Sequence, residues 1–145
     1  MRLTFPITRV GLTVAVLIGP DDQHMQDLSA AGVPLPAPIH GQALIDTGSD
    51  WSALSPAVLA ALQIPASGNV STHTAAGPTN VQSFTVSLTI YDPTGASTDT
   101  LFRGRWRVTG LPYQIPNVDV LLGMDLVSEL ILTVDGPGRQ FAFEF

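Results

Sequence analysis

The stretch Ala43-Leu44-Ile45-Asp46-Thr47-Gly48-Ser49-Asp50 leads from an apolar strand directly into a tight turn. This turn brings together a carboxylate, hydroxyl groups and a glycine. At the rim of a β core such an aspartate can act as a general acid or base, because neighbouring backbone groups are free to donate hydrogen bonds. An ordinary turn is the alternative, because Asp, Gly and Ser are all turn formers. The tetrapeptide Asp46-Thr47-Gly48-Ser49 alone leaves both interpretations open.

A second stretch, Val120-Leu121-Leu122-Gly123-Met124-Asp125, repeats this order of apolar strand, glycine and following helix. Two apolar strands can resemble each other by chance. The shared order of elements nevertheless favours a domain with internal pseudo-symmetry.

The remaining chain is predicted to be mostly β. Thr4–Ile18 is rich in β-branched residues and predicts one or two strands, whereas the polar, proline-dotted Pro20–Pro38 predicts a long surface loop, a candidate insertion. Val70–Tyr91 predicts a hairpin with a broad tip at Ala75–Asn80. Further strand-like runs are Gln42–Ile45, Leu101–Val108, Val118–Leu122, Ile131–Val134 and Phe141–Phe145, the last two forming a closing hairpin about Asp135–Gly138.

Two short helices are expected between these strands. Ser55 is placed as the N-cap of the first, Pro56 suits its first turn, and Pro65 prevents its continuation. Met124–Leu130 predicts the second. The sequence therefore predicts an all-β fold with one or two short helices.

The composition indicates a single folded domain and excludes several kinds of site. The 145 residues are the size of one domain spanning 1–145, and the apolar content of 45% with only 12% charged residues argues against disorder. There is no cysteine, so disulfides and thiolate-ligated zinc are excluded, and the three histidines lack ligand spacing. We therefore expect no metal and no cofactor.

The charge pattern also bears on partners. A net charge of -6 disfavours nucleic acid, so we interpret the alternating Arg103, Arg105 and Arg107 as a solvated strand face. Val10–Ile18 is half the length of a membrane span and lacks a following cleavage site. We expect no membrane association and a cytoplasmic location. The arginine-only basic set, with abundant Ala and Pro, is typical of a GC-rich bacterial genome.

The turn at Asp46-Thr47-Gly48, the following helix, the hairpin tipped by Thr74-Ala75-Ala76-Gly77 and the later Leu121-Leu122-Gly123 together resemble the retropepsin-like aspartic proteases. The resemblance covers most of the chain from Gln42 to Phe145. It implies a closed, all-β domain that hydrolyses peptide bonds. Asp46 would be the catalytic aspartate, Thr47 the residue that braces the active-site loops across a dimer, and Gly48 a close-approach glycine.

The resemblance also implies where a peptide or protein substrate binds. His73–Gln82 would be a flap that closes over an extended substrate, and the substrate-binding residues would be Ser49, Asp50, Ala75, Ala76, Gly77 and Leu121. Trp51, Leu54 and Val120 are either wall residues or plain core. The Ser49 hydroxyl is expected to donate to Asp46 and so extend activity to lower pH.

Peptide hydrolysis of this kind requires two carboxyl groups about 3 Å apart that share a proton. The chain has one Asp-Thr-Gly, and the nearest second candidate, Asp135-Gly136, is interpreted as a hairpin turn. We therefore expect a homodimer with one Asp46 from each copy. In viral members the termini interleave in the dimer. Phe141, Phe143 and Phe145 suit that role or a core edge strand.

One departure concerns the residue after Gly123. Retropepsins commonly carry an arginine there, paired with the acidic residue that corresponds to Asp50, whereas this chain has Met124. Two alternatives to a protease stay open. The first is a peptide- or protein-binding module that keeps the fold without cleaving, and the second is a small β domain in which Asp46–Ser49 is only a turn.

Overall fold

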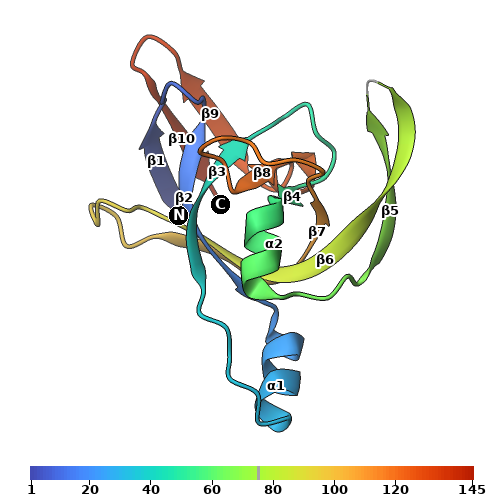
Figure 1. The fold of residues 1–145 in the computed structure, drawn as a ribbon. Coiled ribbons are helices and arrows are strands. Elements are labelled where there is room, and N and C mark those ends of the chain that lie inside the picture. Colours follow the sequence, from blue (N-terminus) through green and yellow to red (C-terminus); the bar gives the residue numbers. More distant parts are fainter. Residues whose placement is uncertain (75) are drawn as a thin grey trace.

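A seven-stranded sheet forms the body of the protein, for which the computed structural model describes residues 1–74 and 76–145. The strand order is β2-β3-β8-β4-β7-β6-β5, and β2 also pairs with β6, which closes the sheet into a barrel with β5 outside the ring (Figure 1). The strands are β2 (Thr13–Pro20), β3 (Ile39–Ile45), β4 (Ala53–Leu54), β5 (Gly68–Thr74), β6 (Gly77–Tyr91), β7 (Thr100–Gly110) and β8 (Val120–Leu122).

Alternation along β6 shows how the sequence builds this barrel. Phe84, Val86, Leu88 and Ile90 are buried, whereas the residues between them are only partly covered. Because successive side chains of a strand point to opposite faces, one face of β6 fills the core. Burying each such side chain contributes about 1.5–3 kcal/mol. The predicted closed, all-β architecture is confirmed.

A separate three-stranded sheet has the order β1-β10-β9, with β1 (Arg2–Pro6), β9 (Ile131–Asp135) and β10 (Gln140–Glu144). It confirms the closing hairpin. Phe5, Phe141 and Phe143 pack with ring centroids 5.5 to 6.2 Å apart. Phe141 and Phe143 are fully buried within their own chain. They therefore belong to the core, although β10 is the central strand of this sheet and not the edge strand considered as the second role.

Two of the helices follow the predictions. In α2 (Pro56–Leu62) the hydroxyl of Ser55 accepts a hydrogen bond from the N–H of Val58 at 3.3 Å, as expected of an N-cap. In α3 (Met124–Val127) the helix is shorter than predicted. No helix in the described ranges is long and apolar enough to cross a membrane.

The prediction of a loop throughout Pro20–Pro38 is wrong, because this segment contains α1 (Asp22–Ala30). The Asp21 carboxylate caps the helix by accepting from the His24 N–H at 3.2 Å, and Gln23 donates to Asp27 at 3.0 Å. None of the helical residues is buried. The helix therefore lacks the apolar periodicity that would reveal it, and its cap is the remaining signal.

The broad hairpin tip is also corrected. Gly77, with φ +112°, opens β6 and pairs with Thr74, so residues 77–80 belong to the strand. Glycine tolerates such a positive φ, which permits the tight reversal. Ala75 lies outside the described residues. Figure 1 shows the β5–β6 hairpin projecting beside the barrel, and α1 at the opposite end of the molecule from the hairpin tip.

Candidate active site

The two similar strand-and-glycine stretches lie side by side. β3 and β8 pair in parallel with Ala43 opposite Val120, Leu44 opposite Leu121 and Ile45 opposite Leu122. The alignment continues one step further, because the N–H of Asp46 donates to the carbonyl of Leu122 at 2.9 Å. Asp46 and Gly123 thus leave the barrel at the same edge, as the internal pseudo-symmetry predicted.

The Asp46 turn fixes one of its own carboxylate oxygens. The N–H of Gly48 donates to Asp46 Oδ1 at 3.0 Å, and the N–H of Ser49 donates to the Asp46 carbonyl at 3.2 Å. Asp46 is half-buried, whereas Thr47 and Gly48 are exposed. A Cβ added to Gly48 would lie 3.3 Å from Asp46 Oδ1, so the carboxylate would have to shift by a few tenths of an ångström. The turn presents an oriented carboxylate at the rim of the barrel.

Ser49 does not bond to the Asp46 carboxylate. Its hydroxyl donates to the carbonyl of Trp51 at 2.7 Å, so the predicted hydrogen bond to the aspartate is wrong. The turn directs the hydroxyl along the chain, toward the residue two positions later. This hydroxyl therefore does not favour the ionised form of Asp46 and gives no reason to expect activity at lower pH.

A polar clamp, formed by Ser52 and Asp125, holds the rest of the turn. Asp125 Oδ1 accepts the N–H of Ser52 at 3.0 Å and its hydroxyl at 2.7 Å, and the Ser52 oxygen accepts the N–H of Gly123 at 2.9 Å. The N–H groups of Met124 and Asp125 donate to the carbonyls of Ser49 and Asp50 at 2.7 and 3.1 Å. The start of α3 is thereby fastened to the Asp46 turn.

Sequence reasoning missed this clamp. Ser52 follows the motif by a few residues and Asp125 follows the glycine by two, so each looks like an ordinary polar residue near a turn. A buried serine in an otherwise apolar run, Trp51-Ser52-Ala53-Leu54, is the signal that could have found it. Buried hydroxyls need hydrogen-bond partners, and Asp125 is the nearest acceptor.

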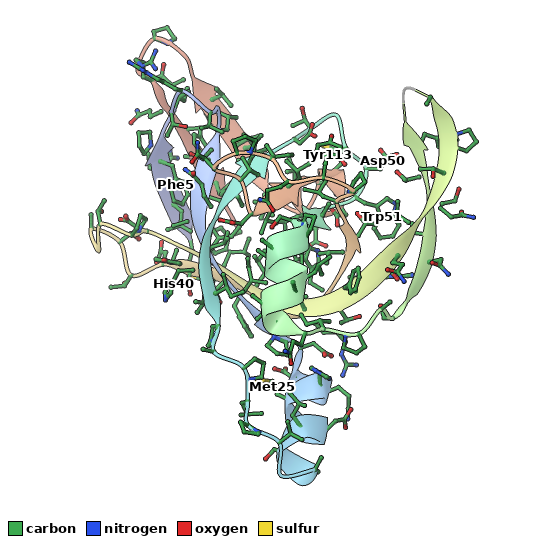
Figure 2. All side chains as sticks on the ribbon, viewed as in Figure 1. Phe5, Met25, His40, Asp50, Trp51 and Tyr113 are labelled. Atoms are coloured by element: carbon green, nitrogen blue, oxygen red, sulfur yellow. The ribbon has the colours of Figure 1, made fainter. Side chains whose placement is uncertain are left out.

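A cavity of about 230 Å³ opens between the turn and the projecting hairpin. Trp51 and Tyr113 lie on the side of the barrel that faces this hairpin, as does Asp50 (Figure 2). The wall combines the turn, both hairpin strands and the segment after β7: Ser49, Trp51, Ala53, Thr72, His73, Thr79, Val81, Thr109, Gly110, Leu111, Pro112, Tyr113 and Leu121.

Some of the expected substrate-binding residues line the cavity and others do not. Ser49 and Leu121 line it, as does Trp51, whereas Leu54 and Val120 are fully buried core. Asp50 is exposed beside it and is not part of the wall. Ala76 and Gly77 are also outside the wall, and Ala75 is not among the described residues.

None of the described residues that line the cavity is Asp, Glu, Lys or Arg. The guanidinium of Arg107 lies 6.0 Å from the ring of Trp51, a residue of the cavity wall. Arg103 pairs with Glu129 at 2.6 Å and Arg105 with Asp21 at 3.4 Å. All three alternating arginines, Arg103, Arg105 and Arg107, thus interact with side chains of their own chain.

The described residues offer one candidate catalytic carboxylate of this kind per chain. Asp135 accepts the N–H of Gly138 at 2.9 Å within the β9–β10 turn, as expected of a hairpin turn. Across residues 1–74 and 76–145, no group of three His, Cys, Asp or Glu residues is arranged to hold a metal ion.

Comparison with known proteins shows the family and the fold. Residues 36–126 match the family model described as aspartyl protease, and the chain therefore belongs to that family. The fold is similar to the crystal structure of a retropepsin-like aspartic protease from Rickettsia conorii, with a TM-score of 0.58 and 12% identity over 99% of this chain and 90% of that one. A search of curated protein sequences finds no match.

Proposed function

We propose that this protein is an aspartic endopeptidase whose active site forms between two copies of the chain, each contributing Asp46. The observation that carries the proposal is the Asp46 turn, which holds one carboxylate at the barrel rim and contributes Ser49 to the wall of the neighbouring cavity. Membership of the aspartyl protease family supports the same chemistry.

The reaction needs two carboxyl groups with different protonation. Two aspartates about 3 Å apart cannot both ionise, so they hold one proton between them. The ionised Asp46 takes a proton from a bound water, whose oxygen attacks the scissile carbonyl carbon, while the protonated Asp46 donates to the carbonyl oxygen. Proton transfer to the amide nitrogen then allows the C–N bond to break. One chain supplies one carboxyl, so catalysis requires the dimer.

The substrate is an extended peptide lying between the Asp46 turn and the β5–β6 hairpin, which acts as a flap. Main-chain hydrogen bonds align such a peptide as an added strand, and cavities beside it select side chains. The wall formed by Trp51, Val81, Leu121 and their neighbours has the character of a subsite for an uncharged side chain.

The direct test is cleavage of a peptide library by the wild-type protein and by Asp46→Asn, with pepstatin as an inhibitor control. Asp22→Asn removes the same charge from α1, at the far end of the molecule, and serves as the matched variant. We expect cleavage by the wild type and Asp22→Asn, and none by Asp46→Asn. Equal cleavage by all three proteins would contradict the proposed mechanism.

A non-cleaving peptide-binding module on the same fold is the second candidate. The cavity would serve both functions, but the intact Asp46-Thr47-Gly48 favours the enzyme. Peptides retained by the wild-type protein without cleavage over a range of pH would favour the binding module.

A further inference from the structure

The two chain ends are already paired with each other inside one copy. β1 and β10 are antiparallel along their whole length, from Arg2 opposite Glu144 to Pro6 opposite Gln140. The terminal ammonium of Met1 donates to the Phe145 carbonyl at 2.6 Å, and the Phe145 N–H donates to the Met1 carbonyl at 3.1 Å. Arg2 and Glu144 add an ion pair. Interleaving the termini with a second copy would require all of these contacts to break.

The free edge of this sheet lies instead on β9. In the order β1-β10-β9, β10 is central and β9 pairs only with β10 among the described strands. The other edge is partly covered, because the Arg2 N–H donates to the Asp99 carboxylate at 3.0 Å. Figure 1 shows β1 on the outer side of this sheet and β9 on the side nearer the end of β3, where the Asp46 turn begins.

The side chains of β9 lack the protection common on edge strands. Edges of monomeric proteins are usually blocked by lysine, proline or a bulge. β9 reads Ile131-Leu132-Thr133-Val134-Asp135, with Ile131 63% and Val134 51% exposed. These two residues, three apart, lie on opposite faces of the strand, so a strand added at this edge would cover apolar surface on both faces.

β9 is also coupled to the Asp46 turn. It begins four residues after α3 ends, and the first residue of α3, Met124, donates its N–H to the Ser49 carbonyl at 2.7 Å. Met124 is itself 36% exposed. Met124 and Ile131 are thus exposed apolar residues at the two ends of this short segment, whereas Leu126 and Val127 between them are buried.

We propose that two copies pair antiparallel through their β9 edges about a two-fold axis, giving one continuous six-stranded sheet that brings the two Asp46 turns together. The free edge is self-complementary under such an axis, because each β9 offers the same N–H and C=O groups to its mate. The need for a second Asp46 rests on the proposed function, whereas the unprotected edge does not.

The first test introduces positive charges on the free edge strand β9. In Ile131→Lys/Val134→Lys both substituted side chains are exposed, so the monomer should still fold. Val33→Lys/Leu35→Lys places the same charges on two exposed apolar residues between α1 and β3. By sedimentation equilibrium, we expect the wild type and the control to dimerise, and the dissociation constant of the edge variant to rise at least about tenfold.

A second measurement uses the absence of cysteine. When the five residues of β9 overlap fully with those of the other copy, Thr133 lies opposite Thr133. Thr133→Cys then places two thiols where antiparallel neighbours have Cα atoms about 4.5 to 5.5 Å apart, within disulfide range. Thr4→Cys on β1 is the control. We expect oxidation to cross-link Thr133→Cys into a dimer that still cleaves peptide, and to leave Thr4→Cys uncross-linked.

The outcomes separate this proposal from the proposed function. A dimer that cleaves peptide, survives the paired lysines and does not cross-link at residue 133 overturns the β9 interface alone. A β9-dependent dimer that does not cleave peptide overturns the enzyme and leaves the interface standing. An active wild type that stays monomeric overturns both.

Discussion

The carboxylate of Asp125 accepts both the N–H and the hydroxyl of Ser52, at 3.0 and 2.7 Å. The same hydroxyl oxygen accepts the Gly123 N–H, so one buried serine joins the Asp46 turn to the strand-and-glycine stretch beside it. The clamp is therefore expected to set the position of Asp46 without contacting substrate.

Ser52→Ala should destabilise the fold and slow catalysis. The change leaves the Gly123 N–H without its acceptor and the Asp125 carboxylate without one donor, which costs about 1–3 kcal/mol. Urea unfolding measures the first effect and kcat/KM the second. Ser29→Ala, on the exposed surface of α1, should match the wild type in both. A Ser52→Ala protein as stable and active as the wild type would show that the clamp does not position the turn.

Gly123→Ala tests how closely the two stretches approach. A Cβ at this position would lie 2.6 Å from the Trp51 carbonyl carbon and 2.8 Å from the Ser49 oxygen. Backbone must move to accommodate it, at a cost of about 1–3 kcal/mol. Gly136→Ala meets nothing within 4 Å and is the control. We expect a lower thermal midpoint and reduced cleavage for Gly123→Ala only.

Ser49→Ala should leave the pH profile of cleavage unchanged. Its hydroxyl is committed to the Trp51 carbonyl rather than to Asp46, so its removal costs about 1 kcal/mol of stability without acting on the aspartate. Profiles of kcat/KM against pH for both proteins check this. A shifted acidic limb in Ser49→Ala would restore a direct role for the hydroxyl.

Thr79→Asp should change which side chain the cavity accepts. Thr79 lies in the wall, whereas Asn80, its neighbour on the strand, does not. A carboxylate at residue 79 should raise kcat/KM for peptides with Lys or Arg at the matching position by about tenfold relative to Leu peptides. Asn80→Asp adds the same charge and should keep the wild-type preference. Identical preferences in both variants would place the specificity site elsewhere.

Asp92 is expected to contribute to acid sensitivity. Hydrogen bonds from the hydroxyl and N–H of Thr94 lower the pKa of Asp92 below its ordinary value of 3.8. A depressed pKa stabilises the folded chain above 3.8, and this contribution is lost as the pH falls through the folded-state pKa. Thr94→Val should therefore lose less stability between about pH 6 and pH 3 in urea unfolding, whereas Thr98→Val should behave as the wild type.

Much of the barrel follows from local patterns. The alternation from Phe84 to Ile90 predicts a half-buried strand, and Ser55-Pro56 predicts the start of α2, because both signals act within a few residues. Helix α1 was not predicted because none of its residues is buried, so its sequence has no helical repeat of apolar residues.

The site was predictable only in part for a similar reason. Asp46-Thr47-Gly48 is contiguous and carries its own turn chemistry. The pairing of Ser52 with Asp125 joins residues 73 positions apart and depends on the parallel packing of β3 beside β8. The direction of the Ser49 hydroxyl is likewise set by the folded turn rather than by residue type.

Two Asp46 carboxyls, one from each copy, are proposed to make a single active site. A sample in which wild type and Asp46→Asn are mixed in equal amounts and allowed to exchange partners tests whether the site is shared. If both carboxyls are required, only dimers of two wild-type chains cleave, and the rate falls to about one quarter of that of an all-wild-type sample. A rate of about one half, as for chains that work independently, would contradict a shared active site.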